Sequence, residues 1–153
     1  MDSLRREPSA KINDLSYKVI GAAIEVHKTL GPGYLEAAYE EALCIQLIVR
    51  GGIPFARQAV LQVGYKGHVV CESRLDLLVG GVLVVELKAI DRLIPLHSAQ
   101  VLSYLKATGC QLGLLINFNT TSLPDGIKTN FAILRSRITF LYSATEDMSD
   151  ERP

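Results

Sequence analysis

The sequence predicts one α/β domain in which helices flank a mixed β-sheet. Its 153 residues fit a single domain, since domains commonly contain about 100 to 200 residues, and a hydrophobic content of 48% supplies a substantial core. Apolar residues recur with helical spacing in the first third of the chain and alternate with polar residues after Pro54. A later helical segment and one more apolar strand complete the expected order α-α-β-β-β-α-β.

Two helices are expected first. In residues 14–30 the apolar side chains form one stripe, and Asn13 or Asp14 can cap the first turn. The run Gly-Pro-Gly over 31–33 should end this helix, because proline cannot continue the hydrogen-bond ladder and glycine accepts left-handed dihedral angles. The second helix should cover residues 34–49 and end at a basic residue followed by two glycines.

Three strands are expected next, over residues 57–65, 68–79 and 82–88, with glycines at the turns between them. The segment VLVVEL at the start of the third strand is almost wholly apolar, which suits a central strand covered on both faces. Glu86 is the exception, and an acid costs free energy in such a place.

A helix over residues 96–108 and a buried strand over 112–118 should follow. A right-handed crossover through that helix would set the strand over 112–118 parallel to the strand over 82–88. Beyond it we expect a polar loop over 119–128. The remaining expectations are a terminal hairpin over 130–134 and 138–142, a domain spanning 1–144, and an acidic, flexible tail over 145–153.

The charge balance limits the kind of nucleic-acid binding that this chain can support. Sixteen bases stand against 16 acids, so the net charge is zero, whereas binding to nucleic acid by electrostatics alone requires a strongly basic surface. The first dozen residues lack the apolar stretch of a secretory signal, and no segment approaches the roughly 18 apolar residues of a membrane span. We therefore expect a cytoplasmic protein that does not bind a membrane.

Glu86 and Lys88 stand two apart on one expected strand, so their side chains point to the same face of the sheet. Asp76 lies on the preceding strand, and its face depends on the turn between the strands. A two-residue turn would pair Asp76 with Val85 and send it to the other face. A three-residue turn over 80–82, with glycine in the left-handed conformation, would set Asp76 opposite Glu86, and this is the turn that we predict.

Two carboxylates side by side in a partly buried setting repel each other, a cost that a divalent cation relieves. Oxygen ligands favour Mg²⁺ or Mn²⁺. Such an ion can polarise a phosphodiester and activate a bound water, while Lys88 adds positive charge near the reacting phosphate. The alternative is that Glu86 and Lys88 form only a structural ion pair, which is the commoner role of two such residues taken alone.

Asp76 followed by Glu86-Leu87-Lys88 resembles the D-x(n)-E-x-K signature of the PD-(D/E)XK nuclease superfamily. The resemblance implies a restriction-endonuclease-like fold, whose α-β-β-β-α-β core agrees with the order expected here. It also implies that Asp76, Glu86 and the Leu87 carbonyl hold the metal ion. Lys88 would then position or activate water. Leu75 departs from the pattern, because the motif takes its name from a proline at that position.

Gln100 and Tyr104 lie four apart on the helix over 96–108 and resemble the Q-x-x-x-Y motif of the exonuclease branch of the superfamily. The resemblance implies that Gln100 orients the site or the substrate and that Tyr104 completes the site. The alternative is an ordinary amphipathic helix, on which a surface residue stands beside a core residue.

The segment from Gly33 to Tyr39 reads G-x-x-E-x-x-Y and resembles the string that names a family of small prokaryotic proteins within this superfamily. The likeness extends over roughly residues 13–118. In related nucleases a glutamate of the first helix points at the metal site, which makes Glu36 a candidate ligand, direct or through water. Its alternative is a solvated glutamate on a helix.

Together these resemblances imply a metal-dependent nuclease that hydrolyses nucleic-acid phosphodiester bonds, with DNA as the expected substrate. Two alternatives stay open. One is a nucleic-acid-binding module that has lost turnover, and the other is an interaction protein in which the acids and Lys88 form a buried charge network. A homodimer is a further expectation, because cutting two strands takes two sites or two visits.

Overall fold

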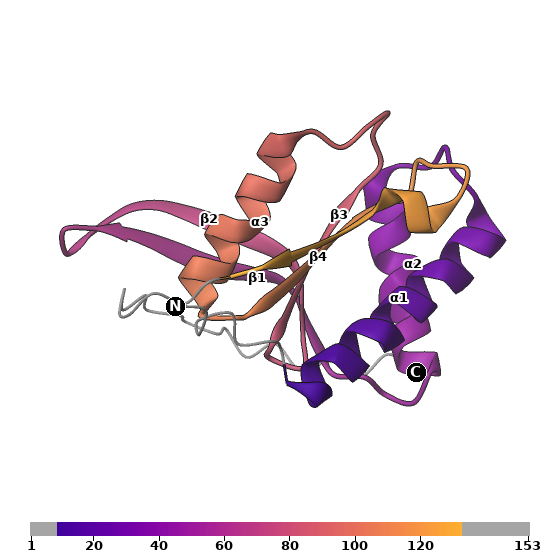
Figure 1. Cartoon of the computed structure of the whole chain (residues 1–153), viewed down its shortest axis with the longest axis horizontal. Coiled ribbons are helices and arrows are strands. Elements are labelled where there is room, and N and C mark those ends of the chain that lie inside the picture. Colours follow the sequence, from indigo (N-terminus) through magenta and orange to yellow (C-terminus); the bar gives the residue numbers. More distant parts are fainter. Residues whose placement is uncertain (1–8, 133–153) are drawn as a thin grey trace, which may run out of the picture.

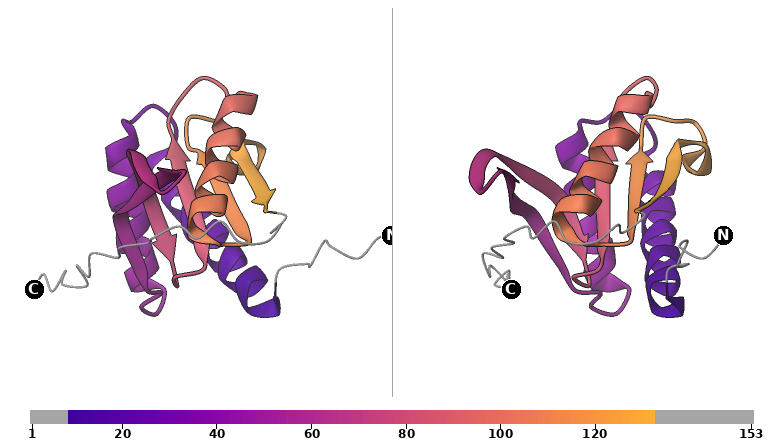
Figure 2. Two further views of the ribbon diagram at one scale, coloured as in Figure 1. Left: turned by 90° about the vertical axis from the view of Figure 1, so that its left-hand side faces the viewer. Right: turned by 60° about the vertical axis from the view of Figure 1, so that its left-hand side comes forward.

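A five-stranded mixed sheet lies between α1 and α2 on one face and α3 on the other (Figures 1 and 2). The computed structural model describes residues 9–132. Within that range the elements are α1 (Ala10–Leu30), α2 (Glu36–Val49), β1 (Phe55–Tyr65), β2 (His68–Val79), β3 (Leu83–Lys88), α3 (Pro95–Thr108), β4 (Leu112–Asn117), the 3-10 helix η1 (Leu123–Gly126) and β5 (Ile127–Phe131). The predicted fold class and order of elements are confirmed.

Each strand of the sheet lies beside its neighbour in sequence, in the order β1-β2-β3-β4-β5. β3 and β4 are parallel, with Leu83 opposite Leu112 and Lys88 opposite Asn117, and the other neighbouring strands are antiparallel. α3 forms the crossover that a parallel pair requires. The predicted parallel placement of the strand after this helix is confirmed.

α1 begins earlier than its apolar stripe predicted. The helix starts at Ala10, and the side-chain oxygen of Ser9 accepts a hydrogen bond from the Ile12 N–H at 3.3 Å. Ser9 is therefore the cap, and the prediction of a cap at Asn13 or Asp14 is wrong. The helix extends because Ile12 packs against the core. Among the described residues, no helix is both long and apolar enough to cross a membrane.

The end of the described chain differs from the prediction of a polar loop over 119–128. That interval contains η1, and β5 already begins at Ile127 as the antiparallel neighbour of β4. Polar composition is compatible with a strand at this edge, because alternate side chains of an edge strand can face water. The predicted strand over 130–134 therefore begins earlier. The predicted strand over 138–142 and the tail over 145–153 lie outside the described residues.

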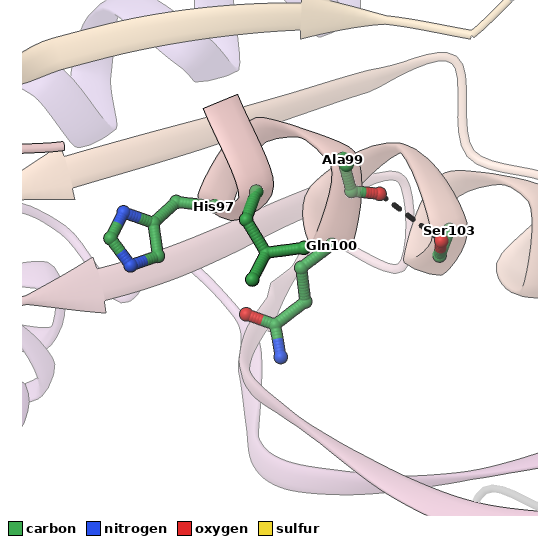
Figure 3. Close-up of a pocket in the computed structure, with 5 residues that line it drawn as sticks. His97, Ala99, Gln100 and Ser103 are labelled. Atoms are coloured by element: carbon green, nitrogen blue, oxygen red, sulfur yellow. Dashed lines mark hydrogen bonds between the residues drawn. The ribbon is translucent and has the colours of Figure 1, made fainter. Parts of the chain in front are cut away.

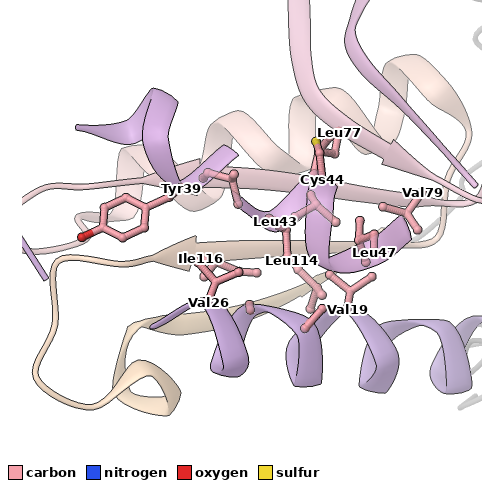
Figure 4. Close-up of a cluster of buried hydrophobic side chains, with 14 of the residues drawn as sticks. Val19, Val26, Tyr39, Leu43, Cys44, Leu47, Leu77, Val79, Leu114 and Ile116 are labelled. Carbon is pink, nitrogen blue, oxygen red and sulfur yellow. The ribbon is translucent and has the colours of Figure 1, made fainter. Parts of the chain in front are cut away.

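Two apolar cores cover the two faces of the sheet. The first lies under α1 and α2, whose buried side chains meet those of the central strands (Figure 4): Val19, Val26, Tyr39, Leu43, Leu47, Leu77, Val79, Leu114 and Ile116. The second lies under α3 and contains Ala59, Leu61, Leu75, Leu78, Val84, Val101, Leu105 and Leu115. With both faces covered, β3 and β4 are almost wholly buried.

α2 and α3 both begin at the end of the sheet where β3 finishes (Figure 1). The first turns of these helices therefore lie near the last residues of β3, one on each side of the sheet. The acids and the lysine singled out from the sequence belong to this end of the molecule.

Candidate active site

Asp76 and Glu86 face each other at the point where β2 and β3 separate. The last paired residues of the two strands are Leu77 and Val85, which places Asp76 opposite Glu86 one step further on. The turn closes over residues 80–82, and its two glycines have left-handed φ values of 59° and 70°. The predicted three-residue turn is confirmed, and it brings the two carboxylates to one face.

Each acid binds the main chain of the other strand. The Asp76 N–H donates to Oε1 of Glu86 at 2.9 Å, and the Leu87 N–H donates to Oδ2 of Asp76 at 2.8 Å. The two carboxylates therefore take the place of the direct main-chain ladder and hold the strands apart at a fixed separation. Because each carboxylate accepts a main-chain hydrogen bond from the other strand, the two acids are held beside each other.

Glu86 is buried, with 4% of its surface exposed. The pKa of Glu86 is raised from 4.5 to about 8, chiefly by burial and then by the negative charge of Asp76, while the Asp76 N–H and the charge of Lys88 act in the opposite direction. The charge of Lys88 therefore compensates the two carboxylates only in part, since the pKa of Glu86 stays raised. A cation bound between the two carboxylates would supply further positive charge.

β2 changes face at Asp76, which sequence periodicity did not predict. Leu75 packs under α3 and Leu77 packs under α1 and α2, although residues two apart on a strand ordinarily share a face. On the neighbouring strand β1, Gln58 has a left-handed φ of 50° at the position between the pairs Arg57–Leu77 and Ala59–Leu75. This conformation is uncommon for a residue with a side chain, and strained backbone of this kind is concentrated at functional sites. Beyond this point β1 and β2 continue as a two-stranded ribbon (Figures 1 and 2).

Gln58 joins the acid pair to α2. Its side-chain amide donates to Oδ1 of Asp76 at 3.3 Å and to Oε1 of Glu40 at 2.5 Å. Arg57 in turn donates to Glu40 at 3.1 Å and to Glu41 at 2.8 Å. Both Asp76 oxygens are thus hydrogen-bonded within the protein. Sequence reasoning missed Gln58 and Glu40, because no motif or period marks either residue and only the fold brings them together.

Glu36, the first residue of α2, lies within electrostatic reach of the acid pair. Its pKa is raised by partial loss of hydration and then by the charge of Asp76, and Lys88 lowers it. Lys88 has the same parity as Glu86 on β3 and so points to the same face. In the described part of the chain Lys88 belongs to no salt bridge, and the ion pairs there are Lys18–Asp14, Arg57–Glu40 and Arg57–Glu41. The simple ion pair of Glu86 with Lys88 is therefore not formed.

Gln100 and Tyr104 approach the acids from α3. The Gln100 amide donates to the Tyr104 hydroxyl at 3.0 Å. Burial raises the pKa of Tyr104, and the negative charges of Glu86 and Asp76 raise it further. A shallow recess of about 320 Å³ opens on the same helix (Figure 3), and its lining residues are Leu96, His97, Ala99, Gln100 and Ser103.

The donor set fits a small divalent cation in part. Asp76 and Glu86 supply oxygen ligands of the kind that Mg²⁺ and Mn²⁺ take. The Leu87 carbonyl points toward β2, as does its N–H, because the two main-chain groups of one strand residue face the same edge. Across residues 9–132, however, no three histidine, cysteine, aspartate or glutamate side chains converge closely enough to hold an ion by themselves. A main-chain oxygen and water would have to complete the shell.

Asn117 holds the chain that leaves β3, and sequence reasoning did not single it out. Its Oδ1 accepts from the Ile90 N–H at 3.1 Å, and its Nδ2 donates to the Ile90 carbonyl at 2.9 Å. Asn117 is 1% exposed, so these bonds satisfy a buried amide. The signal that could have revealed it is a polar residue at the end of an otherwise apolar strand. The clamp fixes the start of the connection from Lys88 to α3.

Comparison of the chain with known proteins identifies a superfamily. No curated protein and no solved structure matches the chain. A family model described as the PD-(D/E)XK nuclease superfamily matches residues 13–130, a range that begins within α1 and ends within β5. The chain therefore belongs to the PD-(D/E)XK nuclease superfamily.

Proposed function

We propose that this chain is a metal-dependent nuclease that hydrolyses nucleic-acid phosphodiester bonds, with DNA as the first substrate to test. The observation that carries the proposal is the buried pair of carboxylates, Asp76 opposite Glu86, at the fork between β2 and β3. Its membership of a nuclease superfamily supports the same chemistry. Assignment to the G-x-x-E-x-x-Y and Q-x-x-x-Y branches is part of this proposal.

Asp76, Glu86 and the Leu87 carbonyl would hold Mg²⁺ or Mn²⁺. When bound, such an ion polarises the phosphodiester and lowers the pKa of a water molecule. Glu36 suits a role through water, because it is exposed and does not form a compact three-acid cluster with the other two acids. Asp76 and Glu86 would also orient the ion toward the open side of the fork.

Lys88 would position the attacking water or stabilise the negative charge that develops on the phosphate. It is free of a salt bridge within the described residues, so its ammonium group can turn toward a substrate. Gln100 and Tyr104 would hold the substrate from the α3 side, where their side chains are already joined by a hydrogen bond.

The test is cleavage of labelled linear duplex DNA and single-stranded DNA with magnesium, by the wild type and by Glu86→Gln. Calorimetric titration with magnesium should accompany it. We expect cleavage and magnesium binding in the wild type and the loss of both in the variant, while the exposed-acid control Glu25→Gln retains both. Cleavage that persists in Glu86→Gln would overturn the assignment of the site.

The outcomes also separate the two other functions that the sequence left open. Binding of nucleic acid without cleavage, by a protein that binds magnesium, would identify a module that has lost turnover. Indifference to magnesium and to nucleic acid would favour an interaction protein with a buried charge network.

A further inference from the structure

Tyr34 presents an exposed aromatic ring just before α2, whose first turn lies at the end of the sheet where β3 finishes (Figure 1). Its side chain is 55% exposed, and the next residue, Leu35, is 82% exposed. Glu36 follows directly, and the charges of Asp76 and Lys88 act on it. Tyr34 therefore lies two residues from Glu36 at the start of α2, and its ring is not buried in the core.

Contacts with the buried Tyr39 fix the position of Tyr34. The Tyr39 hydroxyl accepts a hydrogen bond from the Tyr34 N–H at 3.1 Å and donates to the Gly31 carbonyl. The Tyr34 ring packs edge-on against Tyr39 at a centroid distance of 6.2 Å, and Tyr39 is stacked on Phe118 at 4.6 Å. Tyr39 and Phe118 are both fully buried. An exposed ring on such a rigid base loses little conformational freedom when it binds a partner.

α3 carries a second surface on which an apolar side chain is exposed. Leu96 is 70% exposed and borders the recess that also contains His97 and Gln100 (Figure 3). The His97 Nδ1 accepts the Ile94 N–H at 3.0 Å, so neutral His97 carries its proton on Nε2 and can donate from there. The recess thus combines apolar surface with hydrogen-bond donors and contains no acid.

We infer that the substrate strand crosses the acids between these two surfaces and that it is single-stranded, with unpaired bases stacked on Tyr34 and seated against Leu96. This inference rests on the proposed nuclease function and names its substrate class. Base stacking on exposed aromatic rings is the usual means of binding single strands, because it requires bases that are not already stacked in a duplex.

The charge of the chain favours a single strand over a duplex. Duplex binding depends on many phosphate contacts by lysine and arginine, whereas this chain has 16 bases and 16 acids. Stacking of unpaired bases on a ring adds binding energy that does not depend on phosphate contacts. The strand can be DNA or RNA, since both present unpaired bases, and the experiment includes both.

The experiment measures binding of short fluorescent oligonucleotides to Glu86→Gln protein, by anisotropy at moderate salt, with single-stranded DNA, single-stranded RNA and blunt duplex DNA. We expect at least one single strand to bind about tenfold more tightly than the duplex, and Tyr34→Ala to remove about that factor. Tyr34→Phe should bind like the parent, because the ring makes the contact. The matched control is Tyr17→Ala, an exposed tyrosine on α1 with 75% of its surface accessible.

A duplex that binds as tightly as both single strands would overturn the inference, and so would equal effects of Tyr34→Ala and Tyr17→Ala. Urea unfolding of Tyr34→Ala separates loss of binding from loss of folding, and a binding defect in a variant as stable as Tyr34→Phe supports the inference. The cleavage assay of the proposed function reads out separately. Stacking-dependent binding without cleavage by the wild type would refute the nuclease and leave the single-strand surface, whereas cleavage confined to duplex DNA would do the reverse.

Discussion

Replacing Glu86 with glutamine should stabilise the protein, although the residue lies at the centre of the candidate active site. The pKa of Glu86 is raised from 4.5 to about 8 by burial and by the charge of Asp76. The folded state therefore binds a proton that the unfolded chain releases between these two pH values. The contribution of Glu86 to the free energy of unfolding is therefore fully present below about pH 4.5. It is lost as the pH rises toward 8, above which Glu86 is ionised in both states.

The size of the effect follows from the same pKa values. At pH 7 Glu86 is ionised in the unfolded chain and protonated in the folded protein. This pH lies two and a half units above 4.5, so folding loses about 3 kcal/mol of stability relative to low pH. Glutamine has no charge, and its Oε1 can still accept the Asp76 N–H that now bonds to Glu86 at 2.9 Å. Glu86→Gln should therefore be about 3 kcal/mol more stable than the wild type near pH 7 and equally stable near pH 4.

Urea unfolding followed by far-ultraviolet circular dichroism is the suitable assay, because the chain has no tryptophan for fluorescence. Glu25→Gln, which removes an exposed acid from α1, should leave stability unchanged at both pH values. Millimolar magnesium should narrow the gap by stabilising only the wild type. A Glu86→Gln protein no more stable than the wild type near pH 7, or an advantage of equal size near pH 4, would refute the reasoning.

Three further substitutions test other contacts. Gln58→Ala removes the amide that bonds Asp76 at 3.3 Å, and we expect weaker magnesium binding by calorimetry with at most about 1 to 2 kcal/mol lost from the free energy of unfolding. Tyr39→Phe removes a hydroxyl that makes two main-chain hydrogen bonds, and urea unfolding should show a loss of about 1 to 3 kcal/mol. Gly113→Ala places a methyl group 2.5 Å from Val101 under α3, and the crowding should cost about 1 to 3 kcal/mol in the same measurement.

Each of these expectations has a contrary result. Unchanged magnesium affinity in Gln58→Ala would show that its amide does not position Asp76. A Tyr39→Phe protein as stable as the wild type would mean that water satisfies the freed main-chain groups, and an unaffected Gly113→Ala protein would mean that α3 can shift away from β4.

Local sequence patterns predicted most of the helices and strands of the fold. Helical and alternating periods identified the elements, and a buried apolar run identified β3, because each pattern reports which side of one segment faces the core. The glycine pair at 80 and 81 allowed the three-residue turn to be predicted, and that turn determined which face Asp76 occupies. The pairing of Asp76 with Glu86, and the shared face of Glu86 and Lys88, could therefore be predicted from the sequence.

Contacts between distant segments were not accessible in this way. Leu75 and Leu77 pack on opposite faces of the sheet beside the left-handed Gln58 of β1, and no local pattern marks that residue. The hydrogen bond from Gln58 to Glu40 depends on how α2 lies over β1. The start of α1 at Ala10 likewise depended on packing, because Ile12 contacts the core. The sequence offered several residues that could cap the helix and did not show which one would.

The sequence by itself determined the layered α/β fold, the order of its elements and the face of the sheet that Asp76, Glu86 and Lys88 share, because these follow from periodicity and turn chemistry within short segments. Only the tertiary structure decided how strongly Glu86 is buried, which groups hold Asp76 and what surrounds the acids on the α2 and α3 sides. Desolvation and charge coupling depend on every neighbour in space, and the linear sequence does not state which neighbours those are.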